Sequence, residues 1–202
     1  MFGPIAQPSI AEAKAALRKR MRALRLVADQ KEGPDAALAV VHHVLPRLDE
    51  LRMTPGTVVA GYWPIATEID VRPLLARLGE RGMICALPAM VPERDVLLFR
   101  RWDPAETLEP ADYGTHQPPA GAAEVVPRFV LTPLLAIDRA GHRLGYGRGW
   151  YDRTLAALRR LGEVTAIGIG YGLQCIDRVP AAADDEPVDY ILTERSFERA
   201  DR

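Results

Sequence analysis

The stretch at residues 131–155, LTPLLAIDRAGHRLGYGRGWYDRTL, constrains the fold more than any other part of this chain. The apolar run at 129–137 predicts a buried strand, because it is short and mixes branched side chains. Beyond the run, glycine recurs at every second position, at Gly145, Gly147 and Gly149. The apolar spacing then becomes helical, with Asp152 in the first turn and leucines on one face at Leu155, Leu158 and Leu161. A strand, a glycine-rich loop and a helix N-terminus together predict an anion site, because backbone amides and the helix dipole both favour negative charge.

Cationic side chains add positive charge to this predicted anion site, at Arg143, Arg148 and Arg153. The loop does not match the dinucleotide pattern G-x-G-x-x-G, because Trp150 stands where the third glycine belongs, and it does not match G-x-x-x-x-G-K-[ST]. The alternative is a hairpin-like loop whose glycines serve backbone geometry alone. The cations and aromatic residues around the glycines favour a ligand site.

The order of elements predicts an α/β fold. We expect helices at 9–29, 34–51 and 71–82 and a further helix after Gly149. We expect strands at 57–63, 83–88, 96–102, 129–137, 164–171 and 190–193, with a short charged tail after the last strand. Strands that alternate with helices indicate a single three-layer α/β/α domain over residues 1–202, with a largely parallel sheet. The segment at 103–127 is rich in Pro, Ala and Gly, and we expect it to form a long excursion over the active-site face.

Composition limits the partners of the protein. The 202 residues carry a net charge of −1, which argues against nucleic acid or a membrane surface as a partner, because both select a basic excess. Cys85 and Cys175 form no C-x-x-C pair, and we expect both to be buried free thiols. The sequence has no signal-peptide pattern and no segment long enough to span a bilayer, so we expect a cytoplasmic protein. We also expect the protein to be a monomer.

The helix expected at 9–29 carries a row of cations. Ser9 followed by Glu12 is a capping box. One face carries the apolar stripe, Ile10, Ala13, Leu17, Met21 and Leu24. Another face carries Lys14, Arg18, Arg22 and Arg25. Like charges four residues apart repel, so the row is unfavourable unless an anion or an acidic partner lies against it. A solvated basic face is the alternative.

The first expected strand ends in aromatic residues and is followed by carboxylates. Trp63 and Glu68 stand near its carboxyl end, where open α/β sheets bind their ligands. The alternative for Glu68 is a first-turn carboxylate that offsets a helix dipole. We expect Asp70 to cap the next helix.

The run R-L-G-Y-G-R-G-W-Y-D, from Arg143 to Asp152, resembles the signature of the 5-formyltetrahydrofolate cyclo-ligase family, also known as methenyltetrahydrofolate synthetase. Lys14 and Arg18 resemble the N-terminal K-x-x-x-R of that family, and Asp185 falls in its P-x-x-x-x-D segment. The resemblance implies a fold similar to sugar-isomerase and CoA-transferase domains. It also implies ATP-dependent closure of 5-formyltetrahydrofolate to 5,10-methenyltetrahydrofolate, with release of ADP and phosphate and with Mg²⁺ as cofactor.

The resemblance also implies site residues. The ATP-binding set is Lys14, Arg18, Arg143, Leu144, Gly145, Tyr146, Gly147, Arg148, Gly149, Trp150 and Tyr151. The substrate-binding set, for the reduced folate, is Trp63, Glu68, Tyr146, Gly147, Arg148, Gly149 and Trp150. The metal ligands are Asp152 and Asp185, and Arg148 is the catalytic residue.

Two other functions stay open at this stage. A CoA-transferase or a sugar-phosphate isomerase could use a similar fold. A folate-binding protein without ligase activity is the second alternative, because the chain departs from the family pattern at Gln117, where relatives often carry Glu, and at Asp184, where they often carry His.

Overall fold

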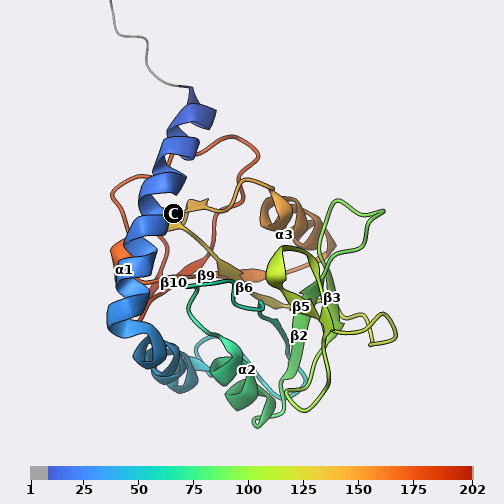
Figure 1. The fold of residues 1–202 in the computed structure, drawn as a ribbon. Helices are drawn as coiled ribbons and strands as arrows, with labels where there is room; N and C mark the ends of the chain where they lie inside the picture. The colour runs from blue at the N-terminus through green and yellow to red at the C-terminus, as the bar shows by residue number, and fades with distance from the viewer. Residues whose placement is uncertain (1–8, 202) are drawn as a thin grey trace, which may run out of the picture.

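A seven-stranded sheet organises the protein, whose computed structural model describes residues 9–201 (Figure 1). The strand order is β11-β10-β9-β6-β1-β2-β3. The sheet contains β1 (Val58–Ala60), β2 (Ile84–Ala89), β3 (Leu98–Arg101), β6 (Phe129–Pro133), β9 (Thr165–Ile169), β10 (Tyr190–Leu192) and β11 (Phe197–Arg199). The five inner strands run parallel, and β3 and β11 add antiparallel edges. The predicted largely parallel α/β sheet is confirmed.

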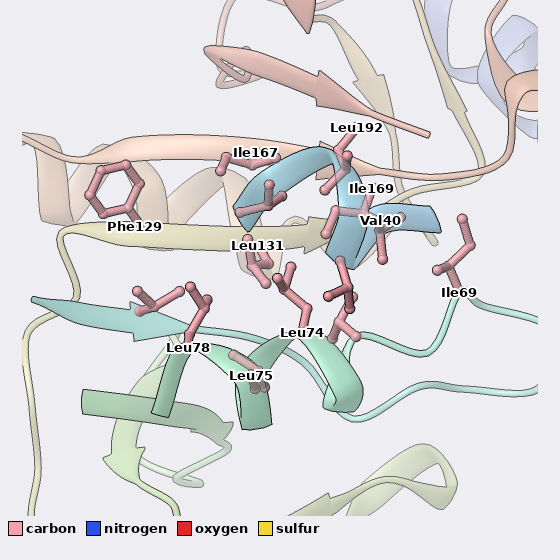
Figure 2. Close-up of a cluster of buried hydrophobic side chains, with 14 of the residues drawn as sticks. Val40, Ile69, Leu74, Leu75, Leu78, Phe129, Leu131, Ile167, Ile169 and Leu192 are labelled. Atoms are coloured by element: carbon pink, nitrogen blue, oxygen red, sulfur yellow. The ribbon is translucent and has the colours of Figure 1, made fainter. Parts of the chain in front are cut away.

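Helices cover both faces of this sheet. α1 (Ile10–Val44) and α2 (Arg72–Gly79) lie on one face, and α3 (Trp150–Leu161) lies on the other (Figure 1). Successive side chains of a strand point to opposite faces of the sheet: Val59 packs into the cluster under α1 and α2, whereas Ala60 packs into the cluster under α3. Figure 2 shows the first cluster, where the leucines of α2 meet Val40 of α1 and Leu131 of the sheet.

Short helices and strands complete the fold. The single-turn helices are η1 (Leu45–Arg47), η2 (Asp112–Gly114) and η3 (Gly172–Gln174). β4 (Glu109–Pro110) pairs with β5 (His116–Gln117), and β7 (Ala136–Ile137) pairs with β8 (Arg143–Leu144). The excursion at 103–127 therefore contains a small hairpin rather than only irregular chain. The prediction of one domain over 1–202 stays a prediction, because residues 1–8 and 202 lie outside the described part.

The prediction of separate helices at 9–29 and 34–51 is wrong, because α1 continues through Pro34 for 35 residues. An interior proline removes one hydrogen bond and costs about 3 kcal/mol. Here α1 buries Ala28 before the proline and Val40 and Val44 after it in the same core cluster, and this packing offsets the local cost. The expected apolar stripe is only partly buried, because the first turns of α1 extend past the sheet and leave Ile10 49% exposed (Figure 1).

The strand predicted at 129–137 is divided into β6 and β7. Pro133 cannot donate to the sheet ladder, and Leu134 beyond it packs over β9, where Gly168 leaves room for its side chain. The expected charged tail after residue 193 instead forms the antiparallel edge strand β11. Leu161, expected on the buried face of α3, is 74% exposed because the last turn lies outside the core cluster.

Two smaller expectations also need correction. Val71, not Asp70, is the N-cap of α2, and Asp70 instead accepts the amide and guanidinium hydrogens of Arg72. Cys85 is a buried free thiol as expected, whereas Cys175 is a free thiol that is exposed. In residues 9–201, no helix is long and apolar enough to cross a membrane.

The continuity of α1 gives a testable prediction. Pro34 is exposed, so Pro34→Ala should restore an interior helix hydrogen bond without disturbing the core. We expect the free energy of unfolding to rise by about 1–2 kcal/mol, because the unfolded chain also gains some freedom when proline is lost. Urea unfolding followed by circular dichroism would measure the change, with Pro46→Ala in η1 as the matched control. An unchanged or lower stability would indicate that a second helix begins at Pro34.

Candidate active site

A cavity of about 760 Å³ opens at the carboxyl ends of β1, β2 and β6. Consecutive strands β1 and β2 are neighbours, and β6 returns to the other side of β1, so the strand order reverses at this point. Open α/β sheets bind ligands at such a switch point. Trp63 follows β1, Met90 follows β2 and Pro133 ends β6, and all three line the cavity.

Every site residue that the sequence predicted lines this cavity. The set is Lys14, Arg18, Trp63, Glu68, Arg143, Leu144, Gly145, Tyr146, Gly147, Arg148, Gly149, Trp150, Tyr151, Asp152 and Asp185. They come from α1, from the segment after β1, from the glycine-rich loop with the start of α3, and from the segment before β10. The fold therefore collects in one place residues that lie far apart in the sequence.

The glycine-rich loop connects β8 to α3 and touches α1. Gly147 has φ +97° and Gly149 has φ +67°, a region that disfavours side chains. A Cβ atom on Gly147 would lie only 3.1 Å from the guanidinium carbon of Arg18. The Nε of Arg18 donates to the Gly145 carbonyl at 2.9 Å. The loop glycines thus serve close approach as well as turn geometry.

The N-terminus of α3 opens into the same cavity. Gly149 is its N-cap, and no side chain caps this helix end. Trp150 and Asp152, in the first turn, line the cavity. Amides of a first helical turn lack intrahelical partners and carry partial positive charge, so this end is suited to bind an anion.

The cation row of α1 lies along the cavity. Lys14 Nζ lies 2.5 Å and 2.8 Å from the two carboxylate oxygens of Asp185. Arg18 binds the glycine-rich loop, and Arg22 lines the cavity. The alternative of a solvated basic face therefore does not hold for Lys14 and Arg18, because each has a specific partner.

Arg25, the last member of the row, belongs to a buried polar cluster. Its Nη1 lies 3.4 Å from Oε1 of Glu68, and the Tyr146 hydroxyl lies between them, accepting from Arg25 and donating to Glu68. The second Glu68 oxygen accepts the Ile65 amide at 2.8 Å. Burial raises the pKa of Glu68, although the bonds from Tyr146, Ile65 and Arg25 oppose that rise. Glu68 is therefore not a surface carboxylate at a helix dipole but a buried acceptor beside the cavity.

The two predicted metal ligands have cationic partners. Oδ1 of Asp152 lies 3.1 Å from Nη2 of Arg143, whose Nη1 donates to the Glu186 carbonyl at 2.6 Å. Burial lowers the pKa of Arg143, and the nearby Asp152 raises it. Asp185 pairs with Lys14. Across residues 9–201, no three His, Cys, Asp or Glu side chains form a group that could hold a metal ion. Two carboxylates that line one cavity nevertheless fit Mg²⁺, which often takes one or two protein carboxylates and completes its shell with water and substrate oxygens.

The sequence did not identify a second set of lining residues. Tyr113 and His116, from the excursion, line the cavity, and the His116 ring lies 5.0 Å from the Trp63 ring. Arg72, which is not among the lining residues, places its guanidinium carbon 4.6 Å from the centroid of the Trp63 ring. A loop without periodicity gives no sequence signal for such contacts, because its path depends on tertiary packing.

The chain is similar to known proteins over most of its length. The profile of the 5-formyltetrahydrofolate cyclo-ligase family matches residues 10–194. The Escherichia coli K12 5-formyltetrahydrofolate cyclo-ligase is 28% identical over 182 residues, 88% of this chain and 96% of that protein. The corresponding Mycolicibacterium smegmatis protein is 34% identical over 152 residues, 68% of this chain and 74% of that one.

A solved structure shares the fold. The NMR structure of Aquifex aeolicus 5,10-methenyltetrahydrofolate synthetase superposes with a TM-score of 0.75 at 30% identity, covering 94% of this chain and 93% of that chain. The family profile spans nearly all of the described residues, including every residue assigned above to the cavity walls. The chain therefore belongs to the 5-formyltetrahydrofolate cyclo-ligase family.

Proposed function

We propose that the cavity holds ATP and a reduced folate side by side, with the phosphates at the glycine-rich loop and the pterin beside Trp63 and Glu68. The reaction is the ATP-dependent cyclisation of 5-formyltetrahydrofolate to 5,10-methenyltetrahydrofolate. One observation carries the assignment of the phosphate end: α1 places Arg18 on the Gly145 carbonyl, so a cation and the glycine-rich loop form one wall.

The phosphate end follows from the distribution of positive charge. Arg18, the loop amides and the start of α3 converge on the same part of the cavity. Arg148 extends from between Gly147 and Gly149 and lines the cavity. Phosphoryl transfer depends mainly on positioning and on neutralising charge, which these groups supply. Lys14 and Arg143 are paired with carboxylates and would contribute mainly by holding Asp185 and Asp152 in place.

The folate end follows from the aromatic wall and the buried carboxylate. A pterin is flat and carries N–H donors, so it can pack on an aromatic face and donate to a carboxylate. Trp63 offers the face, and Glu68 retains acceptor capacity because each carboxylate oxygen has more than one lone pair. Tyr146 connects the two ends, because it stands in the glycine-rich loop and bonds to Glu68.

The chemistry needs activation of a poor leaving group. The formyl oxygen takes the γ-phosphoryl group as the bond to ADP breaks. The folate nitrogen at position 10 then attacks the formyl carbon and gives up its proton, and phosphate departs with the oxygen. The protein residues in this scheme hold the two substrates in contact and stabilise the transferring charge, and none of them forms a covalent bond.

Mg²⁺ is a further part of the proposal. Asp152 and Asp185 line the phosphate end and would hold the ion together with phosphate oxygens. When bound, the ion would neutralise phosphate charge. The carboxylates would then exchange part of their contact with Arg143 and Lys14 for the metal.

The departures from the family pattern do not favour a ligand-binding protein without activity. Gln117 accepts the Met90 amide at 3.1 Å and is not among the described residues that line the cavity. The missing charge at this position therefore removes no group from the cavity wall. Asp184 does line the cavity and adds a carboxylate beside Asp185.

We also propose that a single chain is the catalytic unit and that it works in the cytoplasm. The residues proposed for both substrates come from one chain, so a partner is not needed to complete the cavity. The two cysteines are free, which is consistent with a reducing compartment.

The α1 cations provide the first functional prediction. Lys14→Ala combined with Arg18→Ala should raise the KM for ATP at least tenfold while changing the KM for folate little, because both cations lie at the phosphate end. Lys19→Ala combined with Arg20→Ala is the matched control, because these cations are exposed on the same helix. An equal increase in both KM values would argue against the assignment of the phosphate end. The tenfold figure corresponds to about 1.4 kcal/mol of lost binding.

Asp152 provides a test of the metal site. Asp152→Asn should raise the Mg²⁺ concentration needed for half-maximal turnover, because one carboxylate ligand is lost. It should also lower the free energy of unfolding by about 1–3 kcal/mol, since the buried Arg143 loses its counterion. Glu163→Gln is the control, because that side chain is 92% exposed. A variant with unchanged Mg²⁺ dependence would remove Asp152 from the proposed site.

Arg148 provides the sharpest test of the proposed chemistry. We expect Arg148→Ala to lower kcat by about 10²–10³ with a modest change in the KM for folate, because charge stabilisation is lost in the transition state. Arg148→Lys should recover much of the rate, since lysine acts as a point charge on phosphate. Arg160→Ala, in the exposed last turn of α3, is the control. The assay follows methenyl product absorbance with 5-formyltetrahydrofolate, ATP and Mg²⁺, and wild-type turnover of Arg148→Ala would exclude Arg148 from the reaction.

A further inference from the structure

Tyr113 stands out in the excursion because of its backbone. It has φ 61° and ψ 21°, in the left-handed region, although it is not glycine. Residues that tolerate this region better are glycine and asparagine, so a tyrosine here is held at some cost in energy. Such strain persists where the surroundings enforce it, and it often marks functional segments.

The turn that carries Tyr113 is braced on both sides. η2 connects β4 to β5, and the Thr115 hydroxyl donates to the Asp112 carbonyl at 2.8 Å. The Ala111 amide donates to the Thr115 carbonyl at 2.9 Å. On the side of the cavity where we place folate, the His116 ring lies 5.0 Å from the Trp63 ring. Tyr113 thus stands on a turn that is fixed to the wall of the cavity.

The ring of Tyr113 faces the glycine-rich loop. The guanidinium carbon of Arg148 lies 5.6 Å from the ring centroid, within the range of a cation–π interaction. Among residues 9–201, the Arg148 side chain has no other polar contact: only its carbonyl is bonded, by Arg153 at 2.9 Å. Gly147 and Gly149 flank Arg148, and both have positive φ. The contact with Tyr113 is therefore what directs the Arg148 guanidinium in the protein without substrate.

We propose that Tyr113 is a positioning residue that holds the guanidinium of Arg148 over the cavity before the phosphoryl group is transferred. This inference rests on the function proposed above for Arg148. Tyr113 touches no reacting atom in this scheme and acts through Arg148 alone. The excursion then connects the two halves of the site, because its turn contacts Trp63 through His116 and the phosphate loop through Tyr113.

Substitutions can separate the ring from the backbone. Tyr113→Phe and Tyr113→Trp keep an aromatic face and should retain the wild-type kcat. Tyr113→Asn removes the ring while suiting the left-handed backbone, so the turn is preserved. We expect Tyr113→Asn to lower kcat two- to fivefold with an unchanged KM for folate, a change that matches the strength of an exposed cation–π contact. Val126→Ala, also exposed and in the excursion, is the control and should leave kcat unchanged.

A double-mutant cycle tests whether Tyr113 acts through Arg148. In an Arg148→Ala background, Tyr113→Asn should have no further effect on kcat, because the residue that it positions is gone. If Tyr113→Asn lowered kcat by the same factor with and without Arg148, the inference would be overturned, while the role of Arg148 would remain intact. An equal loss of kcat in Tyr113→Phe and Tyr113→Asn would also overturn the inference, since an aromatic ring would then not be enough to position Arg148. Wild-type turnover of Arg148→Ala would instead defeat the proposed function of Arg148, and the positioning role with it.

NMR gives a readout that does not depend on turnover. The Arg148 side-chain protons should be shifted upfield by the Tyr113 ring, and their assignment follows from their loss in Arg148→Lys. The shift should persist in Tyr113→Phe and disappear in Tyr113→Asn. Identical Arg148 resonances in the wild type and in Tyr113→Asn would show that the ring does not hold the guanidinium, and would overturn the inference whatever the kinetics.

Discussion

A buried cluster of hydrogen bonds among Arg25, Glu68 and Tyr146 connects three segments that are distant in the sequence. Arg25 comes from α1, Glu68 from the segment after β1, and Tyr146 from the glycine-rich loop. The side chains of Arg25 and Glu68 are only 6% and 3% exposed, so removing one partner would leave the other charge buried and uncompensated. Such a loss costs about 3–5 kcal/mol, which makes the cluster a strong constraint on where α1 and the loop lie.

Ion pairs around the cavity explain how it can be rich in charge in a protein whose net charge is −1. Several of its cations have fixed partners, such as Lys14 with Asp185 and Arg143 with Asp152. These pairs shape the walls and keep the aspartates in place. Arg148 remains exposed on the loop, so its charge is available to a ligand. The proposed phosphate site is thus a local concentration of charge in a protein that has no net basic excess.

The parallel sheet determines the position of this site. β1, β2 and β6 end at one edge, and the helix α3 that follows the glycine-rich loop begins there. Trp63 is thereby placed across the cavity from residues more than eighty positions later in the chain. The excursion, which contains η2 and the β4–β5 hairpin, closes a further side through Tyr113 and His116. The cavity is consequently bounded by every layer of the fold.

The sequence alone determined the α/β class and the parallel sheet, because periodicity is a local property of the chain. The resemblance of its short motifs to a family identified the predicted residues that line the cavity. The sequence failed at Pro34, where local propensity favours a break but burial of Val40 and Val44 continues the helix. It also gave no sign of the contacts of Tyr113 and His116. Those contacts depend on the path of a segment without periodicity, and only tertiary packing decides which side chains such a segment brings to the cavity.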